Sequence, residues 1–195
     1  FDGTVEEHTE DEPFSPLGVY GQTKAAGDIA VANCPRHYIV RSSWVIGDGK
    51  NFVKTMAALS DRCADPGDAL NQVTVVDDQF GRLTFTRDMA EGIFWLLGYR
   101  GGDKEPSSPC EPGTYSLTGS ARVASWAEVA AKVFELRNGN GDAVKPVSTS
   151  EYYASAKSPI SPRPTHSALT LDKLAGTGFI PADWEMRMTE YVKSL

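Results

Sequence analysis

The sequence predicts an α/β fold, and three observations lead to this prediction. Short β-rich runs alternate with amphipathic helical segments along the chain. A helix lies between most successive strands, which favours parallel pairing of those strands. With 195 residues, of which 41% are hydrophobic and 23% charged, the chain has the size and composition of one globular domain with a buried core.

The first half of the chain contains two expected helices and two expected strands. In chain order we expect an extended loop over 1–17, a helix over 19–33, a strand over 37–43, a loop over 44–50, a helix over 51–63, a strand over 73–76 and a turn over 77–82. The first loop carries acidic residues and prolines without an apolar period. In the first helix we expect a packing stripe of Ala26, Ile29 and Ala30; in the second, Phe52, Met56 and Leu59 share one face.

The second half continues the alternation. Its expected elements are a helix over 87–99 capped by Thr86, a connection over 101–113, a strand over 113–119, a helix after Ser125, a strand over 144–149, an irregular segment over 158–164 and a final helix led by Asp183. Ser125 and Glu128 form a capping-box pattern ahead of an apolar stripe that includes Trp126. Three prolines in seven residues exclude regular structure from 158–164.

Composition excludes several classes of function. The net charge is −7 and no basic run occurs, so we expect neither nucleic acid nor an anionic membrane as a partner. No apolar run could cross a bilayer and no secretory signal is present, which predicts a cytoplasmic protein. The cysteines and histidines are scattered, so we expect no metal site and no disulfide framework; they are Cys34, Cys63, Cys110, His8, His37 and His166.

Two Tyr-x-x-x-Lys pairs occur, Tyr20 with Lys24 and Tyr153 with Lys157. Residues four apart share a helix face, and a nearby ammonium lowers a tyrosine pKa from ~10 toward neutral pH, where a proton can be transferred. The alternative is an ordinary exposed helix face. The second pair directly precedes the proline-rich segment, whereas the first opens a longer helix before a strand. The strand–helix–strand setting of Tyr20 and Lys24, where α/β folds bind ligands, favours that pair as catalytic.

Several motifs occur around the first pair in a fixed order. They are F-D-G at 1–3, P-L-x-V-Y-G-x-T-K-x-x-G-D at 16–28, I-V-R-S-S-W-V-x-G at 39–47, N-F-V at 51–53, V-V-D-D-Q-x-G at 75–81 and, more weakly, R-P-x-x-S-x-L at 163–169. This pattern resembles the dTDP-4-dehydrorhamnose reductases of the extended short-chain dehydrogenase/reductase superfamily.

The resemblance implies that residues 1–195 are a single truncated reductase domain, the C-terminal part of an NAD(P)-binding Rossmann-like fold with a small α/β substrate-binding subdomain. Residues 1–50 would complete the Rossmann part with the Tyr–Lys helix. Residues 51–195 would form mostly the sugar-nucleotide-binding subdomain, with returns to the Rossmann part. Members of this family reduce the C4 ketone of dTDP-4-keto-L-rhamnose to dTDP-L-rhamnose with NADPH or NADH.

By that resemblance, Tyr20 would donate the proton to the C4 oxygen, and Lys24 would hold the nicotinamide ribose and lower the tyrosine pKa. Both would therefore also contact the cofactor. Ser43, Trp44 and Val45 match the segment beside nicotinamide and sugar. The Trp44 ring could pack on the sugar, although an ordinary core or loop aromatic is the alternative.

Four further residues match expected substrate contacts, namely Asn51, Phe52, Gln79 and Arg163. The guanidinium of Arg163 suits a diphosphate, because its fork can donate two hydrogen bonds. A solvated turn around Asp77, Asp78, Gln79 and Gly81, and a surface loop around Arg163, are the alternatives. Two positions depart from the family pattern: Leu83 replaces a usual Pro and His166 a usual Asn, which implies an altered fit of the nucleotide sugar.

One expected feature is missing from the sequence. The family binds dinucleotide through a Gly-rich turn, and these 195 residues contain no G-x-G-x-x-G. The Ser or Thr of the family's triad lies upstream of F-D-G. We therefore expect the N-terminal half of the same protein as a partner, and we expect the pyrophosphate and adenosine site to lie outside this chain. Alone, this chain should be inactive. A fused or associated epimerase is a further partner that the resemblance allows.

Two other functions stay open. Relatives of these reductases also serve as regulatory subunits, so a non-catalytic sugar-nucleotide-binding or regulatory module is one alternative. An epimerase or dehydratase of the same superfamily is another, although the R-S-S-W and V-V-D-D-Q motifs fit it less well. The presence of both Tyr20 and Lys24 favours catalysis, since a binding module does not need that pair.

Overall fold

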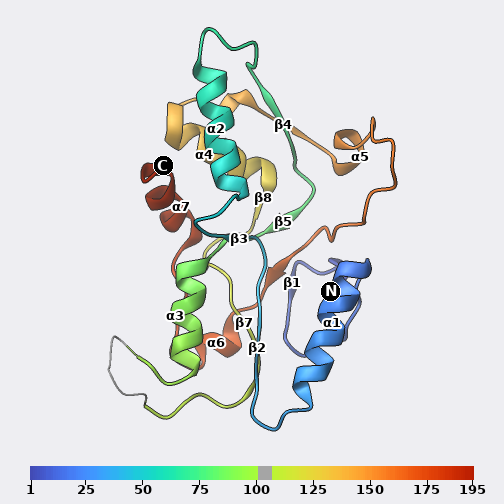
Figure 1. Cartoon of the computed structure of the whole chain (residues 1–195), viewed down its shortest axis with the longest axis vertical. Helices are drawn as coiled ribbons and strands as arrows, with labels where there is room; N and C mark the ends of the chain where they lie inside the picture. The colour runs from blue at the N-terminus through green and yellow to red at the C-terminus, as the bar shows by residue number, and fades with distance from the viewer. Residues whose placement is uncertain (101–106) are drawn as a thin grey trace.

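A computed structural model describes residues 1–100 and 107–195 and has the predicted α/β architecture (Figure 1). Its helices are α1 (Val19–Ala32), α2 (Phe52–Ala64), α3 (Thr86–Leu96), α4 (Trp126–Asn138), α5 (Thr149–Tyr152), α6 (Asp172–Ala175), α7 (Trp184–Lys193) and the 3-10 turn η1 (Gly141–Ala143). Its strands are β1 (Glu7–His8), β2 (Tyr38–Arg41), β3 (Val45–Ile46), β4 (Val73–Val76), β5 (Phe80–Gly81), β6 (Thr84–Phe85), β7 (Gly113–Ser116), β8 (Ala124–Ser125), β9 (Val144–Val147) and β10 (Ala168–Leu169). Residues 101–106 of the expected connection over 101–113 lie outside the described part.

The strands pair in twos, mostly in parallel. β2 pairs with β7 from Tyr38 opposite Gly113 to Arg41 opposite Ser116, and helices α2 and α3 come between them in sequence. The pairs β1–β10, β3–β6 and β4–β9 are also parallel, while β5–β8 is antiparallel. Parallel pairing across intervening helices is therefore confirmed for four of the five pairs in the described chain, while β5–β8 is antiparallel although α3 lies between its strands.

Two hydrophobic clusters hold these elements together. The larger lies between α2, α4 and α7 and the strands β4 and β9, with Val53, Phe134, Trp184 and Met188 fully buried. The smaller lies where β7 meets α3 and α6, and consists of Leu96, Tyr115, Leu117 and Leu174. Figure 1 shows α2 and α4 of the larger cluster above β3, and α3 and α6 of the smaller cluster below it.

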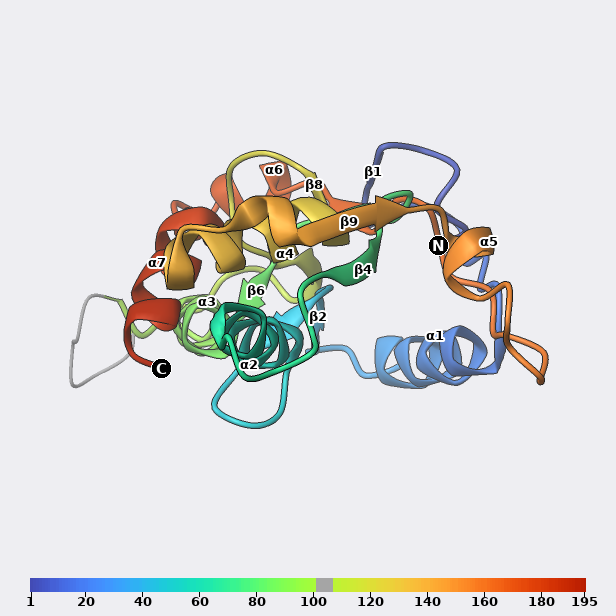
Figure 2. The same cartoon turned by 90° about the horizontal axis from the view of Figure 1, so that it is seen from above.

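Helix α1 lies apart from the other helices (Figures 1 and 2). None of its residues is buried, and Ala26, Ile29 and Ala30 are exposed, so the predicted packing stripe is wrong. Within the described residues, α1 packs beside β2, and a partly buried ion pair at 2.8 Å joins Asp28 of the helix to Arg41 of that strand. A helix with this little apolar contact depends on a few specific interactions for its position.

Side-chain caps mark where several of the helices begin. Ser125 and Glu128 form the predicted capping box of α4, and the carboxylate of Asp183 accepts from the backbone N–H groups of Glu185 and Met186 at the start of α7. The predicted cap at Thr86 is wrong: α3 begins at Thr86 itself, because the helix follows directly on strand β6. The loop expected over 44–50 contains the short strand β3, which pairs with β6.

In the described ranges, no helix combines the length and the apolar character that crossing a membrane requires.

Candidate active site

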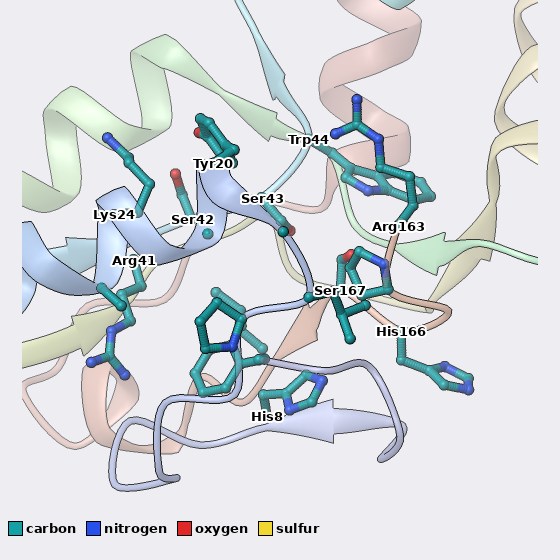
Figure 3. Close-up of a pocket in the computed structure, with 18 of the residues that line it drawn as sticks. His8, Tyr20, Lys24, Arg41, Ser42, Ser43, Trp44, Arg163, His166 and Ser167 are labelled. Carbon is teal, nitrogen blue, oxygen red and sulfur yellow. The ribbon is translucent and has the colours of Figure 1, made fainter. Parts of the chain in front are cut away.

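A cavity of about 860 Å³ lies between the start of α1, the segment after β2 and residues 161–169. Its volume falls in the range of small-molecule sites. Seven of the nine residues predicted from the sequence line it, namely Tyr20, Lys24, Ser43, Trp44, Val45, Gln79 and Arg163. Figure 3 shows them arriving from separate parts of the chain: Tyr20 and Lys24 from α1, Ser43 and Trp44 from the segment after β2, and Arg163 from the segment before β10.

Tyr20 and Lys24 occupy the first two turns of α1. The helix starts after Pro16 and Gly18, and its first turn lies close to Pro16, since a Cβ at Gly21 would be 2.9 Å from the Cβ of Pro16. The Tyr20 side chain is exposed, so its hydroxyl can reach a ligand in the cavity. The second pair has no comparable setting: α5 ends at Tyr152, Tyr153 is its C-cap and Lys157 lies beyond the helix.

Ser43 contributes a buried polar atom to the cavity wall. Its Oγ is enclosed and has no hydrogen-bond partner among the described residues. Its carbonyl oxygen accepts a hydrogen bond from Thr84 Oγ1 at 2.6 Å, which fixes the backbone of this segment. A buried hydroxyl without a partner is costly in the free protein, so Ser43 Oγ is a ready partner for a ligand group.

Asn51 and Phe52 lie elsewhere. Asn51 is the N-cap of α2: its Oδ1 accepts from Lys54 N at 2.9 Å, and its Nδ2 donates to the Gly47 carbonyl at 2.7 Å. Phe52 packs on Trp126 and on the larger cluster. Neither residue lines the cavity in the described chain. Their expected contact with substrate stays a prediction to which this geometry adds no support.

The two ends of the motif pattern meet at the cavity. Gly3 of F-D-G has φ +76°, and a Cβ there would lie 2.6 Å from the Cβ of Pro164 and 2.7 Å from the N of Thr165. Only a residue without a side chain fits between these backbones. F-D-G and R-P-x-x-S-x-L are therefore two halves of one contact, which places Arg163 and His166 beside the loop over 1–17.

The two departures from the family pattern differ in their relation to the cavity. Leu83 is fully buried in the larger cluster and does not line the cavity. His166 does line it, with its ring stacked on Phe80 at 5.3 Å. Of these two positions, only His166 can therefore affect the cavity wall. Gln79 lines the cavity as well, while its Nε2 donates to Thr149 Oγ1 at 2.9 Å.

Further lining residues were not predicted from the sequence, among them Arg41, His8 and Trp126. Arg41 donates to Asp28 and, at 3.0 Å, to the carbonyl of Glu10. His8 is fully buried, and its Nδ1 lies 2.9 Å from Glu12. The position of Arg41 within I-V-R-S-S-W could have indicated its role. His8 lies in a loop without a period, and only the pairing of β1 with β10 brings it here.

No group of three potential metal ligands occurs in the part of the chain that the structure covers. The cavity instead combines an exposed tyrosine, cationic side chains and two indole rings, from Trp44 and Trp126. Such a site can donate a proton, bind an anionic ligand and pack against a flat apolar group.

Comparison with known proteins identifies the family of the chain. The family described as RmlD substrate binding domain matches residues 1–195. A dTDP-4-dehydrorhamnose reductase from Sinorhizobium fredii is 36% identical over 184 residues, covering 91% of this chain and 57% of the relative. The crystal structure of a dTDP-4-dehydrorhamnose reductase from Clostridium acetobutylicum superimposes with a TM-score of 0.81 at 30% identity, covering 100% of this chain and 62% of that one.

A second solved structure, a dTDP-4-dehydrorhamnose reductase from Bacillus anthracis in complex with NADP, superimposes with a TM-score of 0.76 at 28% identity. The superposition covers 100% of this chain and 62% of the Bacillus anthracis chain. The chain thus spans about three fifths of the length of these relatives. The relatives named above are dTDP-4-dehydrorhamnose reductases. Because the RmlD substrate binding domain family matches residues 1–195, the chain belongs to that family.

Proposed function

We propose that this chain is the substrate-binding and proton-donating part of a reductase that converts dTDP-4-keto-L-rhamnose to dTDP-L-rhamnose with NADPH or NADH. One observation carries the proposal: Tyr20 and Lys24 line the same cavity as Ser43, Trp44 and Arg163, in a chain of this family. Proton donor, polar partner, flat aromatic surface and guanidinium are the groups that a nucleotide-linked keto sugar requires.

The residues present fit the nicotinamide end of the cofactor. The buried Oγ of Ser43 has no partner among the described residues and can pair with a polar group of the ligand. Lys24, four residues after Tyr20 on the same helix, can bind the ribose hydroxyls. The cofactor, when bound, supplies the hydride that the ketone carbon accepts. The phosphates and the adenosine would be held by a dinucleotide-binding N-terminal half, since this sequence has no Gly-rich phosphate-binding turn.

The role of each side chain follows from its chemistry. Tyr20 Oη donates its proton to the C4 oxygen as negative charge develops there, and Lys24 Nζ stabilises the phenolate that remains. Proton transfer of this kind contributes ~10²–10⁴-fold to the rate. Arg163 pairs with the diphosphate through its planar fork, and Trp44 provides a flat surface for the sugar.

The test uses the full-length protein that carries this chain. With dTDP-4-keto-L-rhamnose as substrate, loss of NADPH is followed by absorbance, and we expect Tyr20→Phe to lower kcat by about 10²-fold or more because the proton donor is gone. Tyr153→Phe is the matched control and should keep full activity. Inactive wild-type protein that still binds dTDP-sugars would contradict the proposal and favour a sugar-nucleotide-binding or regulatory module.

A further inference from the structure

Trp126 lies in the first turn of α4, and its side chain lines the cavity beside Trp44. The two indole rings are stacked, with centroids 3.7 Å apart and planes 15° from parallel. On Trp126 also lies the ring of Phe52, at 4.5 Å and a tilt of 55°. Trp44 is therefore supported by an aromatic layer that links the cavity to the larger hydrophobic cluster.

The backbone of Trp44 is unusual. Its φ is +50°, in the left-handed region that bulky residues rarely adopt. Thr84, fully buried, holds this conformation from both sides: its N–H donates to the Trp44 carbonyl at 3.1 Å, and its Oγ1 donates to the Ser43 carbonyl at 2.6 Å. An unfavourable backbone conformation that the surroundings hold this firmly is typical of functional sites.

Gly81 makes room for the indole. A Cβ at this position would lie 2.8 Å from Cε2 and 3.0 Å from Cζ2 of Trp44. Gly81 pairs with Ala124 in the antiparallel β5–β8 ladder, and β8 leads directly into Trp126. The β5–β8 ladder therefore positions both Gly81, which lies against the Trp44 ring, and Trp126, which stacks on that ring.

We propose that Trp126 is a positioning residue: with Gly81 against one face of the Trp44 indole and Trp126 stacked on the other, it holds the ring so that its remaining edge contacts the pyranose ring of a sugar nucleotide. The inference rests on the proposed ligand class of the cavity, but not on turnover. Because a rotamer held by stacking is already ordered before the ligand arrives, binding the sugar costs less conformational entropy. Removing the support should weaken binding of the sugar and leave the nucleotide unaffected.

Binding to the full-length protein tests this selectivity, with dTDP and dTDP-L-rhamnose as the two probes. For Trp126→Ala we expect the Kd of dTDP-L-rhamnose to rise roughly three- to tenfold, while the Kd of dTDP changes less than twofold. Trp126→Phe, which keeps an aromatic layer, should restore most of the affinity. Equal weakening of both probes, or no weakening of either, would overturn the inference.

Circular dichroism provides a readout that does not depend on binding energy. Two stacked indoles give an exciton couplet in the far ultraviolet, which should disappear in both Trp44→Phe and Trp126→Phe and remain in Trp95→Phe. Saturation with dTDP-L-rhamnose, but not with dTDP, should change the couplet. A reductase that fails to turn over could still show these effects, so failure of the proposed reaction and failure of this inference are separate outcomes.

Discussion

Two glycines shape this cavity because they have no side chain. Gly3 adopts φ +76° against Pro164, and Gly81 leaves the space that the Trp44 ring fills. Tyr20 and Lys24 could be predicted from the sequence, because their spacing and the surrounding motifs are local. The enclosing residues could not, since the partner that makes each glycine necessary is distant in the sequence.

Replacing Gly3 tests this contact between the two ends of the motif pattern. Gly3→Ala should lower the free energy of unfolding by about 1–3 kcal/mol, because the new methyl group overlaps Pro164 and the left-handed backbone disfavours alanine. Urea denaturation measures the change.

The matched control is Gly49→Ala, where a Cβ meets nothing within 4 Å and should change the free energy of unfolding by less than about 0.5 kcal/mol. Equal effects of the two substitutions would mean that F-D-G does not depend on its fit to Pro164.

At the scale of elements, most of the predicted helices and strands agree with the structure, and the errors share one cause. The stripe on α1 and the cap at Thr86 were inferred from local patterns, but α1 has little to pack against and α3 follows β6 without a turn. Arg41 and Trp126 were missed for the converse reason. Their contacts cross between elements, and no local pattern encodes such contacts.

Helix α1 should open more easily than the rest of the molecule, because it buries no residue and depends on the Asp28–Arg41 ion pair. Asp28→Asn should speed amide exchange within α1 about fivefold, which corresponds to a loss of ~1 kcal/mol for a partly buried pair. Exchange in α2 should stay unchanged. Mass spectrometry with peptide resolution measures both.

The control for this substitution is Asp68→Asn, which removes an ion pair with Arg62 of α2 and does not involve α1. It should leave α1 exchange as in the wild type. Unchanged α1 exchange in Asp28→Asn would show that other contacts hold the helix.

For the molecule as a whole, acid should be destabilising. Hydrogen bonds from Arg137 lower the pKa of Asp61, and hydrogen bonds from Arg62 lower the pKa of Asp68. A carboxyl whose pKa is lower in the folded than in the unfolded state stabilises the fold above the unfolded value of about 4, and this contribution is lost as the pH falls through the folded value.

We therefore expect the Tm to fall as the pH is lowered from about 5 to about 3, measured by scanning calorimetry. Asp61→Asn should flatten this part of the Tm profile, because it removes one of the carboxyls that must be protonated. A Tm that rises over the same range would show that other groups dominate the acid transition.

The pairing of β1 with β10 also determines when the cavity can exist. Residues 7–8 and 168–169 are separated by most of the chain, and closing so long a loop must be paid for in entropy before its contacts stabilise it. During synthesis, α1 and β2 emerge from the ribosome long before the segment that completes the cavity. The cavity is therefore expected to form late, only after residues 161–169 have been synthesised and β10 has paired with β1.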